Sequence, residues 1–425
     1  MLKFLKIIFL MVMLSPSIAM AQSGTWTLLP NSPDTPDRFD DIYFVSDSTG
    51  WAVNSQGKIY KTIDAGNSWT QQLSANVYFR AVEFLNADTG FAGTLNGKFF
   101  KTTNGGDLWY QIEDSLPVQI EGICGMSHVG NTIYACGIWS TPAYVLKSID
   151  AGTTWTMISL SAYAGAAVDC WFLSADTGFV SGSSAFYGDG VILKTTDGGE
   201  TWGLKKETDP GNYVWKLDFL NHQLGYASVE DVNSQHPSTF LKTMDGGETW
   251  MQSIVCPNNI DMEGIGFLND TLGWCGGWST GMWETTNGGL TWNYLDIGSN
   301  FNRYFRRNNH LMYLSGKEIY KYQSEGIPTG AATPSAASVM PHTLFPAIPN
   351  PFSKSITMKF TLDRTTRVVI EVYGSSGMVY QQKLGFVTQG LHEQQLDLSQ
   401  LAAGDYVLVL KTNERFISQQ ISCQR

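Results

Sequence analysis

Six short segments of the chain share one pattern, and this repeat constrains the fold more than any other feature. In each segment, which we call a box, an Asp or Asn lies two residues before a glycine and five before a tryptophan, as in Asp64-Ala-Gly66-Asn-Ser-Trp69. The tryptophans recur at intervals of 40–48 residues. A period in this range is typical of proteins built from stacked structural repeats. The most conspicuous residues are therefore expected to belong to the scaffold.

The residue types of the box fit a tight turn. The side-chain oxygen of Asp or Asn accepts hydrogen bonds from backbone N–H groups that follow it, and the glycine adopts a positive φ without steric cost. The tryptophan supplies a large apolar surface for burial. An EF-hand calcium loop needs oxygen ligands at alternating positions and a terminal glutamate, which these segments lack. We predict structural roles, without catalysis or metal binding, for Asp64, Trp69, Asn104, Trp109, Asp150, Trp155, Asp197, Trp202, Asp245, Trp250, Asn287 and Trp292.

Strand-like segments surround each box. In five repeats an aromatic residue lies six positions before a glycine that another aromatic follows, as in Phe84, Gly90 and Phe91. This is the pattern of two strands joined by a reverse turn. A third strand ends in Lys-Thr or a similar pair just before the box, and a fourth begins near the tryptophan. Four strands in 40–48 residues make one antiparallel propeller blade, so we predict an all-β fold.

Six boxes predict six blades, and the ends of the repeat region supply a seventh. Residues 300–323 contain three strand-like segments without a box. Residues 25–29 resemble the segment that follows each box, but have no blade of their own. We predict that this N-terminal strand completes blade seven and closes the ring, because closure protects sheet edges. The predicted seven-bladed propeller spans residues 22–325.

The first 21 residues have the features of a signal peptide. Lys3 and Lys6 precede the apolar run 7–14, and Ala19-Met20-Ala21 fits a cleavage site. The alternative is a membrane anchor, but this run is short and no other segment approaches the roughly 20 apolar residues of a membrane span. We predict export, a mature start at Gln22 and no transmembrane span in the mature chain.

Composition argues against several classes of function. The net charge is −11, whereas nucleic-acid binding needs clustered Lys and Arg. No Cys or His cluster has metal-ligand spacing, so we predict no metal and no cofactor. The six cysteines are too few for a disulfide framework. Cys124 and Cys136 flank a predicted hairpin turn at 129–132, and the sequence does not decide whether they form a disulfide.

A second domain follows a linker. Residues 326–344 are rich in Gly, Pro, Ala, Ser and Thr, which is linker composition. Residues 345–425 contain alternating strand-like segments with a hairpin turn at 374–377. We predict a small Ig-like β-sandwich there.

Two resemblances add to these predictions. The motif Ser/Thr-x-Asp-x-Gly-x-x-Trp resembles the Asp box, or BNR repeat, and the series of boxes over residues 24–325 is most similar to the photosystem II assembly and stability factor family of seven-bladed propellers. In the second domain, Pro349-Asn-Pro-Phe352, Val372-Tyr-x-x-x-Gly377 and Leu401-x-x-Gly404-x-Tyr406 resemble the type IX secretion (Por) sorting domain of Bacteroidetes. That resemblance implies recognition by the type IX secretion machinery, removal of the tail, and a product that is secreted or attached to the outer surface. The chain departs from it in lacking a basic C-terminal end, and Cys423 has no role in the motif.

Function is expected on the propeller face opposite the boxes. Blades four and five have longer loops there, at 183–189 and 230–236, and loops on a rigid scaffold often bind ligands. Neutral variation in loop length explains the same observation equally well. The candidate ligand-binding residues in these loops and around the channel mouth are Arg38, Arg80, Glu121, Trp139, Tyr187, Trp215, Glu263, Trp278, Arg303 and Arg306.

Two functional hypotheses remain. The first is a non-catalytic module that binds a protein or a glycan. The alternative is an Asp-box glycoside hydrolase acting on extracellular glycans. A sialidase would need three convergent arginines, for which Arg38, Arg80 and Arg303 are available, and another glycosidase would need a carboxylate pair, drawn from Glu121, Asp169 and Glu263. Spacing alone supports neither set, and we predict no catalytic residue.

Overall fold

The structure is a computed structural model, and the chain divides into two compact units, Met1–Pro328 and Thr329–Arg425. It describes residues 24–137, 143–185, 188–209, 211–232, 236–324, 343–344, 347–362, 365–374, 377–388, 390–412 and 416–424. The predicted signal peptide lies outside these residues, as does the predicted linker apart from residues 343–344. Among the described residues, no helix is long and apolar enough to cross a membrane.

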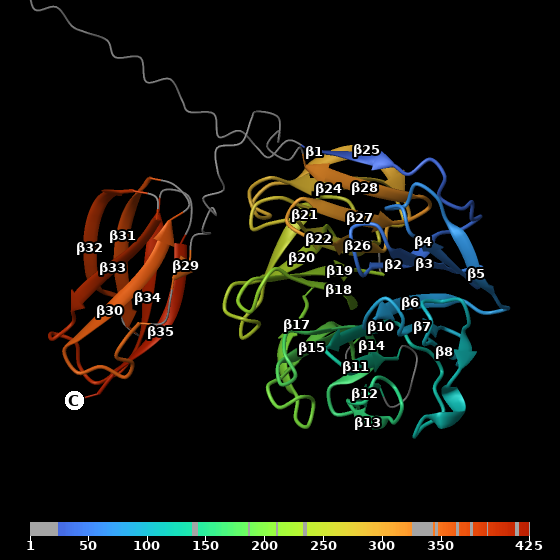
Figure 1. Cartoon of the computed structure of the whole chain (residues 1–425), viewed down its shortest axis with the longest axis horizontal. Coiled ribbons are helices and arrows are strands. Elements are labelled where there is room, and N and C mark those ends of the chain that lie inside the picture. Colours follow the sequence, from blue (N-terminus) through green and yellow to red (C-terminus); the bar gives the residue numbers. More distant parts are fainter. Residues whose placement is uncertain are drawn as a thin grey trace, which may run out of the picture. The chain divides into compact units, whose positions relative to one another are not determined.

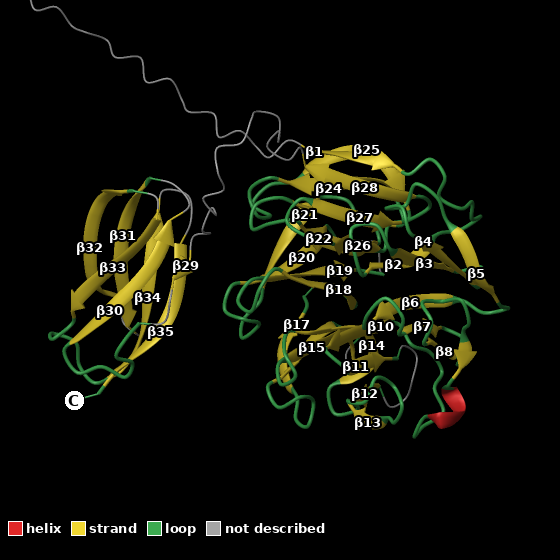
Figure 2. Ribbon diagram, in the orientation of Figure 1, coloured by secondary structure: helices red, strands yellow, loops and turns green. Residues whose placement is uncertain are grey.

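The first unit consists of seven four-stranded antiparallel sheets that follow one another round a ring (Figure 1). The first strand of each sheet contacts the first strands of its neighbours, so these strands lie innermost. Figure 2 shows that strands and loops account for almost all of this unit, and one short 3-10 turn, η1 (Glu113–Ser115), is the exception among the described residues. The prediction of an all-β seven-bladed propeller is therefore confirmed.

In blades one to four the strands follow one another in chain order from the axis outward. Blade one has β2 (Phe39–Phe44), β3 (Gly50–Asn54), β4 (Lys58–Thr62) and β5 (Thr70–Ser74); blade two has β6 (Phe79–Phe84), β7 (Gly90–Thr94), β8 (Phe99–Thr102) and β9 (Tyr110–Gln111). Blade three has β10 (Gly125–Val129), β11 (Thr132–Cys136), β12 (Tyr144–Ser148) and β13 (Thr156–Ser159); blade four has β14 (Ala164–Phe172), β15 (Gly178–Ser184), β16 (Gly190–Thr195) and β17 (Gly203–Glu207).

The remaining blades continue the same order. Blade five has β18 (Tyr213–Phe219), β19 (Gly225–Glu230), β20 (Ser238–Thr243) and β21 (Met251–Cys256); blade six has β22 (Met262–Phe267), β23 (Gly273–Gly277), β24 (Thr280–Thr285) and β25 (Asn293–Ser299). Blade seven has β26 (Arg303–Arg306), β27 (Leu311–Ser315), β28 (Ile319–Ser324) and, from the N-terminal end, β1 (Gly24–Leu28).

The N-terminal strand completes the ring. Strand β1 pairs antiparallel with β28, so that Thr25 lies opposite Gln323 and Leu28 opposite Tyr320. Its Trp26 packs edge-on against Trp274 at 5.2 Å between ring centroids. Because the first and last strands of the propeller share one sheet, the ring is held closed by a full antiparallel ladder.

Stacked aromatic rings join neighbouring blades. The aromatic that ends an innermost strand lies flat against the aromatic on the second strand of the preceding blade. Trp51 stacks on Phe84 at 3.5 Å, and Phe44 stacks on Tyr313 of blade seven at 3.7 Å. These stacked pairs bury large apolar rings between neighbouring blades. The repeated aromatics of the sequence thus hold the blades together.

The boxes form the turns between third and fourth strands. In blade one the Thr62 hydroxyl donates to Asp64 Oδ1 at 2.9 Å and accepts the Gly66 N–H at 2.8 Å. Gly66 has a φ of +86°, which favours glycine. The Trp69 indole donates to the Gly66 carbonyl at 3.1 Å. Lysines of the third strands tie blades together through these turns, as where Lys194 donates to the Gly246 carbonyl of the next box at 2.7 Å.

The second unit is a β-sandwich, in agreement with the predicted fold. One sheet has the order β29 (Thr343–Leu344), β30 (Ser355–Leu362), β33 (Gly390–Asp397); the other has the order β32 (Gly377–Val387), β31 (Thr366–Gly374), β34 (Gly404–Thr412), β35 (Phe416–Cys423). Its core includes Phe352, Phe360, Val372, Leu408 and Cys423. Cys423, for which the sequence offered no role, is thus a buried core residue.

Candidate functional site

The innermost strands carry a β-bulge at the same place in five blades. In each, an extra residue is inserted four positions before the aromatic that ends the strand, between Phe39 and Asp41 in blade one for example. A bulge re-aims a side chain that regular alternation would direct elsewhere. The residues at the bulges are Asp40, Arg80, Val168, Trp215 with Lys216, and Glu263. The bulges therefore bring ionisable side chains toward the axis of the ring.

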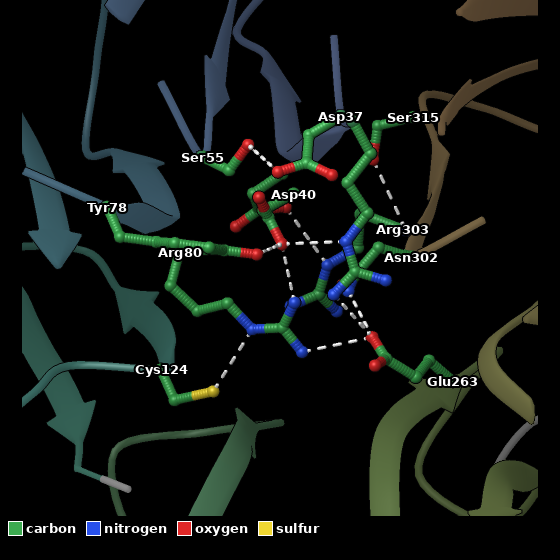
Figure 3. A network of polar contacts seen from close by, with 12 residues as sticks. Asp37, Asp40, Ser55, Tyr78, Arg80, Cys124, Glu263, Asn302, Arg303 and Ser315 are labelled. Carbon is green, nitrogen blue, oxygen red and sulfur yellow. Dashed lines mark hydrogen bonds and ion pairs between the residues drawn. The ribbon is translucent and has the colours of Figure 1, made fainter. Parts of the chain in front are cut away.

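Two arginines and two carboxylates form a buried cluster at the axis. Asp40 Oδ1 accepts from Arg38 Nε at 3.0 Å and from Arg80 Nη1 at 2.6 Å. Glu263 Oε2 accepts from the Nη2 atoms of the same arginines at 2.9 and 3.1 Å. Figure 3 shows Arg80 and Glu263 reaching toward each other from separate ribbons. Because Arg80 belongs to blade two and Glu263 to blade six, this pair spans the ring.

Neutral donors complete this cluster. The Tyr78 hydroxyl donates to Asp40 at 3.1 Å, and the Asn302 amide donates to Glu263 at 2.5 Å. The Trp278 indole donates to the other oxygen of Glu263 at 2.8 Å. Arg80 Nε also donates to the Cys124 sulfur at 3.4 Å, as Figure 3 shows. Glu263 therefore holds four donors, and its two oxygens are both engaged.

A second set of ion pairs lies beside the first. Arg303 of blade seven donates through Nε to Asp41 Oδ1 at 3.1 Å and through Nη2 to Asp169 Oδ1 at 3.0 Å. Asp41 and Asp169 also accept backbone N–H groups of the neighbouring blades, from Val82 and Leu217. Arg306 pairs with Asp218 at 3.1 Å. These contacts connect blades one, two, four, five and seven across the axis.

Burial and pairing act in opposite directions on these groups. Burial favours the neutral form of Glu263, but Arg80 and Arg38 outweigh it and hold its pKa below the ordinary value. Lys216 behaves differently. Burial lowers its pKa, and the charges of Arg303 and Arg80 lower it further, while the charge of Asp169 opposes them. Its ammonium is buried without a hydrogen-bond partner among the described residues. The axis is thus filled by the charged side chains of the chain itself.

The mouth of the channel carries one exposed aromatic side chain, Trp278, and several acidic side chains that are largely buried. Trp278, between β23 and β24, is 41% exposed and lies over the Arg38 guanidinium at 3.9 Å. Trp215 stacks with Tyr213 at 5.2 Å and donates its indole N–H to Glu230. The backbone N–H of Trp278 donates to the backbone carbonyl of Asp261 at 3.3 Å. All of these residues lie at strand ends opposite the boxes.

Glu230 is a largely buried carboxyl at this mouth. Burial raises its pKa to about 7; the Trp215 hydrogen bond opposes this, while the nearby charges of Glu263 and Asp261 add to it. The next residue, Asp231, pairs with the half-exposed His236 at 2.5 Å.

A shallow hollow of about 720 Å³ lies elsewhere on this face, over η1 and the residues that follow it, and Glu121 is part of its lining.

The structure places the predicted ligand-binding residues in three groups. Arg38, Arg80, Glu263, Arg303 and Arg306 come together at the axis, where other side chains of the chain occupy them. Trp215 and Trp278 lie at the mouth, with Trp278 exposed, and Glu121 is exposed at the separate hollow. Trp139 and Tyr187 lie outside the described residues. The three arginines proposed for a sialidase do converge, but Asp40, Glu263, Asp41 and Asp169 take the position of an anionic substrate.

Sequence reasoning missed Asp40, Asp41, Lys216 and Glu230. A signal for the first two was present, since adjacent acids in an otherwise apolar strand break the period-2 alternation and indicate a bulge. Side-chain direction argues against the Cys124–Cys136 disulfide that the sequence left open. All six cysteines are in the reduced form in this structure, and Cys124 packs in a different core cluster from Cys136. No group of three or more His, Cys, Asp or Glu among the described residues is arranged to hold a metal ion.

Comparisons with known proteins agree with this architecture. Residues 347–424 match the family described as a secretion system C-terminal sorting domain. The first unit resembles YCF48 bound to D1 peptide, with a TM-score of 0.54 at 16% identity, covering 71% of this chain and 97% of that chain. YCF48 from Cyanidioschyzon merolae gives a TM-score of 0.56 at 16% identity over 70% and 98% of the two chains. At these identities the likeness concerns the fold alone.

Other solved propellers include an enzyme. The GH74 enzyme of Niastella koreensis gives a TM-score of 0.53 at 16% identity, covering 79% of this chain and 59% of that chain. No curated protein sequence matches this chain. The C-terminal match means that the chain carries a sorting domain for export by the type IX secretion system.

Proposed function

We propose that the exported propeller binds an extracellular polypeptide across its channel mouth and performs no catalysis. The observation that carries this proposal is the combination of the exposed Trp278 at the mouth with an axis filled by internal ion pairs. A ligand cannot displace Glu263 or Asp169 from buried arginines without leaving those charges unpaired. Binding is therefore expected on the rim, where Trp278 presents one open face.

The chemistry of the rim favours a ligand with cationic side chains. Asp261 accepts the backbone N–H of Trp278, Glu230 lies close enough to Asp261 to be affected by its charge, and the Arg38 guanidinium lies beneath the Trp278 ring. An exposed tryptophan beside carboxylates suits a Lys or Arg side chain through cation–π and charge interactions. The solved structure of YCF48 with a D1 peptide supports a peptide ligand by analogy of fold.

Binding is tested with the purified full-length protein and fluorescent peptides that differ only in Lys/Arg against Glu content. We expect the cationic peptides to bind more tightly, and Trp278→Ala to weaken binding at least tenfold. The matched control is Leu290→Ala, which removes an exposed apolar residue from a box on the opposite face. Equal affinity of both variants, or preference for the acidic peptides, would contradict the proposal. If glycans bind in a parallel array and no peptide binds, the ligand is a glycan and not a polypeptide.

A glycoside hydrolase is the second candidate, and one observation favours it. Glu230 has a pKa of about 7 and lies close enough to Asp261 to be affected by its charge, which is the relation of an acid to a second carboxylate. The earlier candidates Asp169 and Glu263 are poorly suited, since arginines neutralise both. Turnover of a glycan library that Glu230→Gln and Asp261→Asn each abolish would establish this alternative and overturn non-catalytic binding.

Localisation and processing are part of the same proposal. We expect residues 1–21 to be removed at the inner membrane and the sorting domain, from about residue 345, to be removed after transport by the type IX machinery. The mature propeller is then released or attached to the outer surface. Mass spectrometry of the culture medium and the cell-surface fraction should find propeller peptides without peptides of 345–425. Full-length chain confined to the cytoplasm would refute the export pathway.

A further inference from the structure

Two buried cysteines face each other between blades three and four. Cys136 ends β11 of blade three and Cys170 lies on β14 of blade four; both are almost fully buried in one core cluster with Tyr134. The Cys170 thiol lies 3.9 Å from the carbonyl oxygen of Tyr134, and after burial the neighbouring Cys136 thiol is the next cause of its raised pKa. Because Tyr134 and Cys136 are two residues apart on one strand, their side chains share the face toward blade four.

We propose that Cys136 and Cys170 form a disulfide that cross-links blades three and four after export. This inference depends on the type IX export pathway but not on the nature of the ligand. Disulfides persist outside the reducing cytoplasm, and a sorting domain directs this chain there. In the reaction the two thiols lose two protons and two electrons and form one S–S bond. The electrons pass to a disulfide of an oxidoreductase or a small molecule, which becomes two thiols.

The burial of both thiols determines when the disulfide forms. Burial raises the pKa of the Cys170 thiol well above its usual range, and thiolates are the reactive species in disulfide exchange. Oxidation of the folded propeller is therefore slow. The disulfide is expected to form while the chain folds after crossing the inner membrane, before blade four covers Cys136.

The other cysteines lack this relation. The Cys124 sulfur accepts the Arg80 N–H at the axis and packs in another cluster. Cys256 and Cys275 share a cluster between blades five and six, but the Cys256 thiol donates to the Asn258 carbonyl at 3.2 Å and is directed toward its own loop. Cys423 belongs to the other unit. These four residues provide internal controls in the same molecule.

The interface that the disulfide joins also carries the Tyr134–Phe172 ring stack at 3.4 Å. On its other side, blade three has His128 where the aromatic of the repeat stands in other blades, and this residue pairs with Glu83 instead of stacking. Blade three therefore has its stacked ring contact on the side of blade four, while its Trp155 packs edge-on against Phe91 and Phe99 of blade two. A covalent link on that side adds to the ring stack between blades three and four.

The test is a peptide map of the exported protein, alkylated under denaturing conditions without reductant. Trypsin leaves Cys136 within 102–147 and Cys170 within 148–194, so we expect these peptides to be linked until reductant is added. Because Cys124 shares the first peptide, fragmentation spectra or the Cys124→Ser variant assign the link. Cys256 and Cys275 should be alkylated at once, as should Cys423 in any chain that still carries the sorting domain. Full alkylation of both Cys136 and Cys170 would overturn the proposal.

A stability measurement gives a second, independent readout. Reductant should lower the Tm of the exported wild-type protein and leave that of a Cys136→Ala/Cys170→Ala variant unchanged. The comparison is made within each protein, so a cavity created by the substitutions does not affect it. Cytoplasmically expressed, reduced protein should lack the linked peptides. A wild-type Tm that does not respond to reductant would contradict a stabilising cross-link.

Discussion

Replacing Glu263 with glutamine removes one negative charge from the centre of the ring and preserves the side-chain shape. Glu263 is 3% exposed and accepts hydrogen bonds from Arg38, Arg80, Asn302 and Trp278. In the variant the two buried guanidinium groups retain only Asp40 as a shared carboxylate. Breaking a buried ion pair by removing one partner costs about 3–5 kcal/mol, because an uncompensated charge remains buried. We expect the free energy of unfolding to fall by that amount.

The assay is thermal unfolding of wild type and variant, followed by circular dichroism at pH 7. At roughly 2 °C per kcal/mol for a large domain, the Tm of Glu263→Gln should fall by about 6–10 °C. The matched control is Glu248→Gln, which removes a carboxylate that also pairs with two cations, Lys194 and Lys205, at 2.6 and 2.7 Å, but is 52% exposed. Exposed pairs contribute at most about 1 kcal/mol.

The result that would refute the reasoning is equal destabilisation by the two substitutions. A double-mutant cycle with Arg80→Met adds a sharper test. The coupling between Glu263 and Arg80 should be about 1–3 kcal/mol, although the two residues are 183 positions apart in the sequence. Additive effects would mean that the cross-ring contact does not hold the blades together.

Three further predictions concern other parts of the propeller. The pKa of Glu230 is raised from 4.5 to about 7, so between these pH values the folded state keeps the proton that the unfolded state loses. The free energy of unfolding of the wild type should therefore fall by on the order of 3 kcal/mol as the pH rises through this window. Glu230→Gln should show a flatter Tm profile over pH 4.5–8, and parallel profiles would contradict the assignment. Trp202→Ala should cost about 3–5 kcal/mol in urea unfolding because the buried indole packs edge-on against Phe172, whereas an unchanged midpoint would show that this tryptophan contributes little. Deleting Gly24–Leu28 uncovers the edge of β28, and size-exclusion chromatography should then show self-association; a monodisperse monomer would argue against ring closure as the protection of that edge.

The sequence was sufficient to predict where much of the candidate site lies. The sequence placed Arg80, Trp215 and Glu263 among the candidates around the channel mouth, because strand geometry is local and the repeat preserves it. Their burial and pairing were not accessible. A one-residue bulge is a local change that turns a side chain toward the axis, and alternation alone does not reveal which residue it re-aims.

The sequence by itself determined the repeat, the turn chemistry of the boxes, the blade count and the sorting domain, since each depends on residues within about one blade of each other or on a short motif. The tertiary structure alone decided that the conspicuous charges at the axis neutralise one another. Arg303 meets Asp41 across 262 residues of chain, and only closure of the ring brings such side chains together. The exposed rim around Trp278 is what remains for a partner, because the charges beneath it are already paired within the chain.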